Sequence, residues 1–242
     1  MPALLLIAHG SRDPRHAATV AALVGEVRAQ RPGVEVATAY LDHCAPRIPQ
    51  VVGRLADAVA VPLLLNRAFH AKHDIPAALR AAGSRLPVAD VLGPSPLLLA
   101  ALDRRLAGAG LDVSSPAVRA RTGVVLAAAG SSDPAAGAAT RAVAAEWRRT
   151  RGWAAVEVAH ASAAGPRVPD ALAALRAAGA TRTAVAPYLL APGLLPDRIA
   201  AASGGADVLA DVLGPAPELA ALLLERYDEA RREASAVPAL TA

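Results

Sequence analysis

Short uninterrupted apolar runs alternate along the chain with longer segments whose apolar residues recur at helical spacing. Such short runs are typical of strands buried on both faces of a parallel sheet. The predicted strands of the first half are Ala3–Ala8, Val34–Tyr40, Ala58–Leu65 and Ala89–Leu92. The predicted helices are His16–Gln30, Ile48–Asp57, Ile75–Gly83 and Pro96–Ala107. Alternating strands and helices indicate right-handed crossovers onto a parallel sheet.

The second half repeats this order of elements. Its predicted strands are Gly123–Ala128, Ala154–Ala159, Arg182–Leu190 and Val208–Val212. Its predicted helices are Ala136–Arg151, Val168–Ala178, Asp197–Ala202 and Pro217–Ser235. Five landmarks recur in order at offsets between 120 and 125, which is too long for a solenoid repeat. The repeat therefore predicts two similar α/β, flavodoxin-like domains over residues 1–115 and 122–236. Each has a mostly parallel four-stranded sheet flanked by helices.

The two copies differ at one conspicuous turn. The first copy is Leu-Ile-Ala-His-Gly-Ser-Arg-Asp-Pro, ending at Pro14, and the second is Leu-Ala-Ala-Ala-Gly-Ser-Ser-Asp-Pro, ending at Pro134. His9 thus becomes Ala129, while the Gly-Ser-x-Asp-Pro turn is kept. A turn kept in both copies is interpreted as architecture, and a histidine kept in one copy as part of an active site. The second domain is accordingly predicted to be a degenerate copy.

Composition excludes several classes of protein. Hydrophobic residues make up 54% of the chain and charged residues 19%, which argues against disorder. Aromatic residues at 2% argue against a nucleic-acid stacking surface. The longest apolar stretches are too short for a membrane span, and the lone Cys44 allows no internal disulfide. We therefore expect a cytoplasmic protein with neither nucleic-acid nor membrane partners.

The basic residues are almost all arginine, and the net charge is +4. Two interpretations stay open at this point. The arginines reflect a general preference for that residue, or some of them hold an anionic ligand through bidentate contacts.

Three polar segments follow predicted strands of the first half. They are His9, Tyr40–His43 and Asn66–His73. Because ligands of doubly wound sheets bind at the carboxyl ends of the strands, these segments are expected to converge on one edge. His9, His70 and Asp42 would place two imidazoles and a carboxylate together there. This donor set suits transient binding of a divalent first-row metal, or removal of protons near neutral pH.

Simpler interpretations compete with these. A lone His9 can be a hydrogen-bonded strand-end residue, and the Gly10–Ser11 turn at a helix start can bind an anion instead. His43 beside Cys44 invites a zinc interpretation, but an inert Cys44 is favoured over it. His73 is interpreted as a solvated surface residue.

The motifs resemble a known family. The segments Ala-His-Gly-Ser-Arg-Asp-Pro ending at Pro14, Ala-Tyr-Leu-Asp ending at Asp42, and Phe-His-Ala-Lys-His-Asp-Ile-Pro ending at Pro76 are similar to those of the sirohydrochlorin chelatases. The resemblance covers nearly the whole chain, since the long form of that family has a degenerate second half. It implies a chelatase-like fold with a tetrapyrrole in a cleft between the domains.

The resemblance also implies site residues. His9 and His70 would be catalytic and would hold the metal, and Asp42 would stand where a glutamate is frequent. The implied reaction is ATP-independent insertion of a divalent metal into sirohydrochlorin, with Fe²⁺ favoured over Co²⁺ and no permanently bound cofactor. A non-catalytic metal or tetrapyrrole carrier is the other alternative.

Sirohydrochlorin is a polycarboxylate, so basic and hydroxyl side chains near the histidines become candidate substrate contacts. These candidates are Ser11, Arg12, Arg47, Arg67 and Lys72. Each of the charged ones can equally be a solvated surface charge. A monomer and a homodimer both stay open, because a duplicated chain can supply both walls that a shorter relative would build from two copies.

Overall fold

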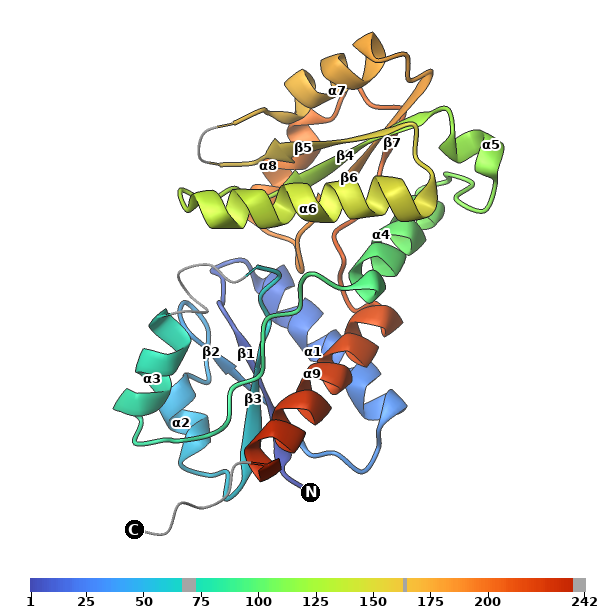
Figure 1. Ribbon diagram of the computed structural model, residues 1–242. Coiled ribbons are helices and arrows are strands. Elements are labelled where there is room, and N and C mark those ends of the chain that lie inside the picture. Colours follow the sequence, from blue (N-terminus) through green and yellow to red (C-terminus); the bar gives the residue numbers. More distant parts are fainter. Residues whose placement is uncertain (67–72, 163–164, 237–242) are drawn as a thin grey trace. The chain divides into compact units, whose positions relative to one another are not determined.

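The computed structural model describes residues 1–66, 73–162 and 165–236. The chain folds into two compact units, each a parallel sheet flanked by helices (Figure 1). Unit 1 comprises Met1–Ser95 and Pro215–Ala242, and unit 2 comprises Pro96–Gly214.

Unit 1 is built on three parallel strands in the order β2-β1-β3. The strands are β1 (Ala3–Ala8), β2 (Val36–Tyr40) and β3 (Ala58–Pro62), and the helices are α1 (Pro14–Gln30), α2 (Ile48–Val52), α3 (Ile75–Ala81) and α9 (Pro217–Ala236). The central strand β1 is buried along its whole length. Leu5 and Ile7 pack with Ile48 of α2 and Ile75 of α3. The alternate residues of β1 therefore face the layer formed by α1 and α9.

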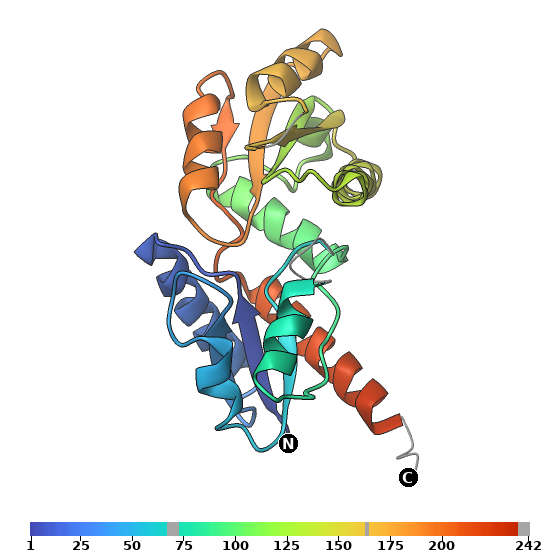
Figure 2. The ribbon, with the colours of Figure 1, turned by 90° about the vertical axis from the view of Figure 1, so that its left-hand side faces the viewer.

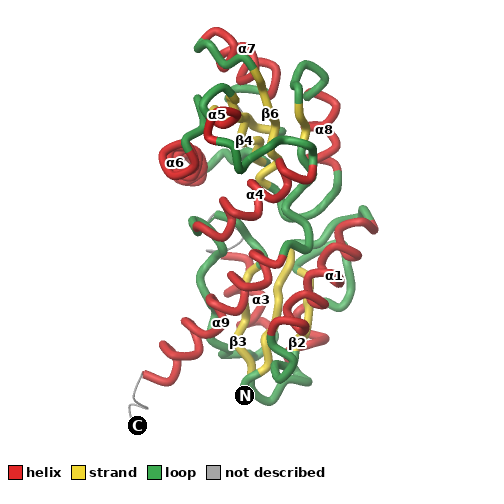
Figure 3. Tube along the Cα trace, turned by 90° about the vertical axis from the view of Figure 1, so that its right-hand side faces the viewer, coloured by secondary structure: helices red, strands yellow, loops and turns green. Residues whose placement is uncertain are grey.

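Unit 2 has four parallel strands in the order β5-β4-β6-β7. The two middle strands, β4 and β6, are labelled in Figure 3. The strands are β4 (Thr122–Ala128), β5 (Ala155–His160), β6 (Arg182–Tyr188) and β7 (Val208–Leu209). The helices are α4 (Pro96–Gly108), α5 (Pro116–Arg119), α6 (Pro134–Arg151), α7 (Val168–Ala177) and α8 (Leu194–Ala202). Val125 and Ala127 of the central strand pack against Leu172 and Leu175 of α7. The two sheets confirm the predicted parallel α/β architecture.

The compact units differ from the expected division at 1–115 and 122–236, because the last helix of each sequence repeat belongs to the other unit. Helix α9 packs beside α1 and β3 of unit 1 (Figure 2). There the Tyr227 hydroxyl donates to the Pro2 carbonyl at 2.6 Å, and Arg31 pairs with Asp228 at 2.8 Å. Helix α4 packs on β6 of unit 2. Its Asp103 accepts a hydrogen bond from Trp147 Nε1 of α6 at 2.8 Å.

The prediction of a fourth strand in the first half, at Ala89–Leu92, was wrong. Within the described residues, the bridge found here is an isolated parallel one between Ala60 and Val88, the residue before the predicted strand. Ala89 N donates to the Ala60 carbonyl at 2.8 Å, and Leu92 N donates to Leu64 at 2.9 Å. In this register the next bonds of the ladder would need an N–H from Pro87 on one side and from Pro62 on the other, and proline has none.

The other predicted elements are confirmed, with shifts at their ends. Helix α2 ends at Val52, five residues before the predicted end at Asp57, and β7 is shorter than predicted. Helix α5 lies between the two expected domains, 1–115 and 122–236, where no helix was predicted. Helix ends depend on caps and packing as well as on apolar spacing, so they are the least predictable feature.

In the part of the chain that the structure describes, no helix combines the length and apolar character needed to cross a bilayer.

The packing of α9 on unit 1, although α9 is the last helix of the second sequence repeat, can be tested by mutation. Replacing Tyr227 with Phe removes the hydrogen bond between α9 and the first residues of unit 1, and we expect the free energy of unfolding to fall by about 1 kcal/mol in a urea titration. Tyr188→Phe is the matched control. The Tyr188 hydroxyl is buried and has no partner among the described residues, so its removal should be neutral or slightly stabilising. Equal losses in the two variants would contradict the assignment.

Candidate functional site

The turn after β1 is shaped by one glycine and a helix cap. Gly10 has φ +91°, a left-handed conformation that favours glycine. Ser11 Oγ accepts from Asp13 N at 3.1 Å, and the Asp13 carboxylate caps α1 by accepting from Arg15 N at 2.9 Å. The Ser11 hydroxyl is thus engaged within the turn. His9 is held directly between the buried strand and this turn.

The same turn lies against the loop that follows β2. A Cβ atom on Gly10 would overlap the backbone carbonyl of Asp42. Asp42 N donates to the His9 carbonyl at 2.8 Å, and Leu41 N donates to Ala8 at 2.9 Å. These contacts place His9 and Asp42 side by side, as the sequence predicted for two strand ends of one edge.

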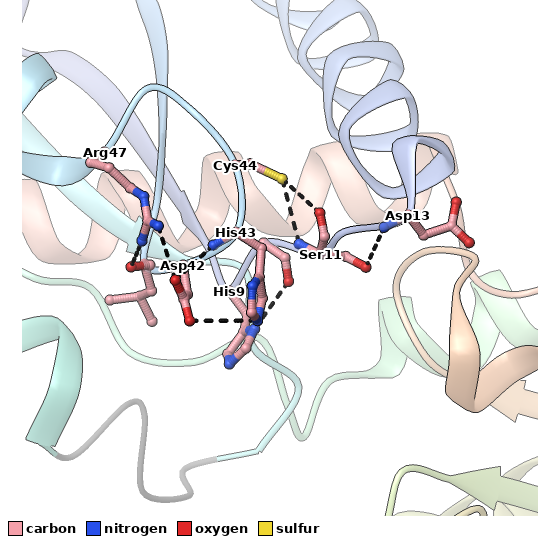
Figure 4. Close-up of polar contacts among 9 residues, drawn as sticks. His9, Ser11, Asp13, Asp42, His43, Cys44 and Arg47 are labelled. Carbon is pink, nitrogen blue, oxygen red and sulfur yellow. Dashed lines mark hydrogen bonds and ion pairs between the residues drawn. The ribbon is translucent and has the colours of Figure 1, made fainter.

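Cys44 closes this contact between the two loops (Figure 4). Its thiol donates to the Ser11 carbonyl at 3.0 Å and accepts from Ser11 N at 3.4 Å. The thiol is partly exposed, and its hydrogen bonds give it a structural role. His43, beside it, adopts φ +60°, which is uncommon for a residue with a side chain.

Three imidazoles gather around this loop contact. His9 Nδ1 donates to the Gly10 carbonyl at 3.0 Å, which puts the ring's lone pair on Nε2. The ring centroid of His43 is 6.2 Å from that of His9 (Figure 4). His16 lies in the first turn of α1, and the centroid of its ring is 6.3 Å from that of Tyr40. Burial lowers the pKa of His16, and nearby His9 adds to this shift.

The Asp42 carboxylate is held in its ionised form. Oδ1 accepts from the backbone N–H of His43 at 2.8 Å and from Arg47 Nη2 at 2.9 Å. The pKa of Asp42 is lowered, first by the hydrogen bond from His43 N and then by Arg47. His43 Nε2 lies 3.5 Å from the second carboxylate oxygen. The loop therefore presents a stable negative charge beside the imidazoles.

Arg47 stabilises the conformation of this loop. Its Nη1 donates to the Leu41 carbonyl at 2.6 Å, in addition to the pair with Asp42. The matching Arg167 of unit 2 donates to the His160 carbonyl at 2.9 Å. An arginine that binds a strand-end carbonyl in both units is first of all part of the loop, and its role as a substrate contact stays a prediction.

The remaining predicted site residues fall into two groups. Arg12 lies on the surface of the turn and is exposed. His70, Arg67 and Lys72 lie outside the described residues, so the predicted pairing of His9 with His70 stays a prediction. His73 precedes α3 and is exposed, in agreement with the surface interpretation.

Unit 2 contains the same loop contact, with alanines at the positions of His9, His16 and His43 and with His160 at the position of Tyr40. Gly130 has φ +90°, and a Cβ atom there would overlap the carbonyl of Ser162. Ser162 N donates to the Ala129 carbonyl at 2.9 Å, as Asp42 N does to His9. This confirms that the turn is architectural. His16, which was not predicted as a site residue, could have been found by the same comparison, because its counterpart is Ala136.

Among the described residues there is no group of three or more histidine, cysteine or carboxylate side chains arranged to hold a metal ion. The described edge instead offers one histidine nitrogen with a lone pair, two neighbouring imidazoles and one carboxylate. This arrangement can accept protons, or contribute ligands to a metal that passes through the site.

Comparisons with known proteins give the same picture for both halves. The CbiX family model matches residues 3–109 and again 123–230. A sirohydrochlorin ferrochelatase of Priestia megaterium is 28% identical over 209 residues, which cover 82% of this chain and 77% of that protein. A sirohydrochlorin cobaltochelatase of the same organism is 27% identical over 215 residues, covering 82% of this chain and 67% of that protein.

Solved structures share the fold. SirB from Bacillus subtilis with Fe³⁺ superposes with a TM-score of 0.79 at 24% identity, covering 97% of this chain and 98% of that one. CbiX, described as the terminal enzyme of sirohaem biosynthesis in denitrifying bacteria, superposes with a TM-score of 0.67 at 22% identity, covering 97% and 99%.

The lowered pKa of His16 predicts a pH dependence of stability. The folded protein favours the neutral ring, whereas the unfolded chain protonates it near the ordinary value of 6.5. The stabilisation is therefore present above about pH 6.5 and is lost as the pH falls towards the folded pKa. Urea unfolding between about pH 8 and 5 should show this loss, and it should be smaller in His16→Gln. The surface variant His73→Gln should keep the wild-type profile, and an unchanged profile in His16→Gln would exclude the assignment.

Proposed function

The chain belongs to the CbiX family, and from this membership we propose that it is a sirohydrochlorin chelatase that inserts a divalent metal without ATP. The observation that carries the proposal is the difference between the two units. Both keep the glycine turn and its contact with the next loop, and only unit 1 keeps His9 and Asp42 on it. The two relatives named above act on sirohydrochlorin according to their names.

The proposed reaction exchanges two pyrrole protons for one metal ion. The metal must lose bound water, and both protons must reach a base. His9 Nε2 carries the lone pair that can take a proton or bind the metal, and His70 is proposed as the second imidazole. Asp42, kept ionised by His43 N and Arg47, supplies negative charge that favours an incoming cation and a protonated imidazole.

Asp42 acts through its charge in this proposal. Its Oδ1 is already occupied by His43 N and Arg47, and its side chain is shorter than a glutamate. We assign direct metal contact to His9 and His70, and an electrostatic role to Asp42. The tetrapyrrole is proposed to bind against this edge, with Ser11, Arg12, Arg67 and Lys72 near its carboxylates.

Fe²⁺ is the favoured substrate metal, and Co²⁺ is the alternative. The relatives named for the two metals are 28% and 27% identical to this chain, so similarity does not separate them. Insertion rates measured with each metal and sirohydrochlorin distinguish the two. A carrier would bind the tetrapyrrole without the spectral change of metal insertion.

The histidines provide the main test. We expect His9→Ala and His70→Ala each to lower the insertion rate by about a hundredfold or more, because each removes a proton acceptor or metal ligand. The measurement is the absorbance change of sirohydrochlorin on addition of Fe²⁺ or Co²⁺. His73→Ala is the matched control and should insert metal at the wild-type rate. Normal turnover in both His9→Ala and His70→Ala, with folding retained, would reject the assignment.

Arg12 provides a test of substrate binding. It is exposed on the turn that carries His9, so we expect Arg12→Ala to raise KM for sirohydrochlorin about tenfold, with kcat nearly unchanged. Steady-state kinetics at saturating metal give both constants. Arg232→Ala removes an arginine from α9 and should leave KM unchanged. A fall in kcat at constant KM would instead assign Arg12 to the chemical step.

A further inference from the structure

A hollow of about 620 Å³ is lined by residues of α6 and of the edge strand β5 of unit 2. We call it the α6–β5 groove, and its walls include Arg141, Arg148, Trp153, Val156, Val158 and His160. In Figure 1, α6 runs along the sheet beside β5. The volume is in the range of sites for small organic ligands. All of its wall residues belong to unit 2.

Two ring nitrogens of the groove wall are buried and lack hydrogen-bond partners among the described residues. Trp153 is only 3% exposed, and its indole N–H has no acceptor. His160 Nδ1 is also buried and has no hydrogen-bond partner among the described residues. Native structures rarely leave buried polar groups unpartnered, because each one costs stability. Both nitrogens are closed off from solvent, so a ligand in the groove would meet these two residues through other atoms of their side chains.

The charges of the groove favour an anion. Arg141 and Arg148 are seven positions apart on α6, which places them on one face about 10 Å apart along the helix axis. Across the described ranges, neither forms an ion pair, whereas Arg149 pairs with Glu146. Glu157 is the carboxylate in the groove wall.

The surface between the two arginines is apolar. It is formed by alanines of α6 and by the valines of β5. His160 adds no positive charge near neutral pH, because burial, followed by Arg141 and Arg167, lowers its pKa. A ligand that matches this wall carries anionic groups at two places and an apolar body between them.

Unit 1 lacks these features at the matched positions. Arg28, which corresponds to Arg148, donates to the Val36 carbonyl at 3.0 Å and so covers its strand. The position of Arg141 is occupied by Ala21. The pair of arginines is therefore a property of unit 2 alone.

We propose that the α6–β5 groove binds an organic dicarboxylate with an apolar body, whose carboxylates pair with Arg141 and Arg148. Guanidinium groups bind carboxylates in a bidentate way, which suits the exposed arginines on α6. Trp153 lies in the wall of the groove, so its indole resonance reports on a ligand bound there. This site is independent of metal insertion.

The chain contains its own reporter and reference. Trp147 and Trp153 are its two tryptophans, so a ¹⁵N–¹H spectrum has two indole resonances. Trp147 Nε1 already donates to Asp103. Titration of the full chain with suberate, a flexible aliphatic dicarboxylate, should shift the Trp153 resonance saturably and leave that of Trp147 nearly in place.

Matched variants and probes make the test specific. Arg148→Ala and Arg141→Ala should each weaken suberate binding about tenfold, whereas Arg232→Ala should not change it. Octanoate, which has the same chain length and one carboxylate, should bind about tenfold more weakly than suberate. Inorganic phosphate should not shift Trp153.

Three results would overturn the proposal. They are the absence of a saturable Trp153 shift, equal affinity for octanoate or phosphate, and unchanged suberate binding in both groove variants. Arg148→Ala should insert metal at the wild-type rate, and His9→Ala should still bind suberate. Failure of the groove proposal and failure of the chelatase proposal are therefore distinguishable.

Discussion

The site of this protein depends on a close backbone contact between two loops at the carboxyl edge of a parallel sheet. Gly10 can approach the Asp42 carbonyl only because it lacks a Cβ atom and adopts a positive φ. Two backbone hydrogen bonds, from Leu41 and Asp42, then join the loops. His9 and Asp42 are held together by the backbone, so their side chains are positioned without having to bind each other.

This constraint separates architecture from chemistry. Unit 2 repeats the glycine, its φ and the hydrogen bond to the preceding strand end, while the residues at the positions of His9 and Asp42 are Ala129 and Ser162. The fold therefore needs the backbone contact and not the imidazole. Because a parallel α/β unit places its strand ends at one edge in either case, the unit keeps this fold with Ala129 at the position of His9.

Much of this was predictable from the sequence, for local reasons. The strand β1 and the turn at His9 follow from an uninterrupted apolar run and a glycine with a helix cap, which are signals carried by neighbouring residues. The exchange of α4 and α9 was not predictable, since apolar spacing shows that a helix has a buried face but not which sheet covers it. The contact of Cys44 with Ser11 and the approach of His43 to His9 also depend on loop geometry that spacing does not specify.

Comparing matched positions of the two units also distinguishes candidate site residues that residue type and spacing do not separate. Arg47 and Arg12 were both candidate substrate contacts, but Arg47 has a counterpart, Arg167, that binds a strand-end carbonyl in unit 2. A residue that is present in both units stabilises the loop in both. Arg12, by contrast, is replaced by Ser132 in unit 2, just as His9 is replaced by Ala129. The same reasoning brings His16, replaced by Ala136, into the group that belongs with the chemistry. Residues lost together from the second copy are those on which we expect the function of the first to depend.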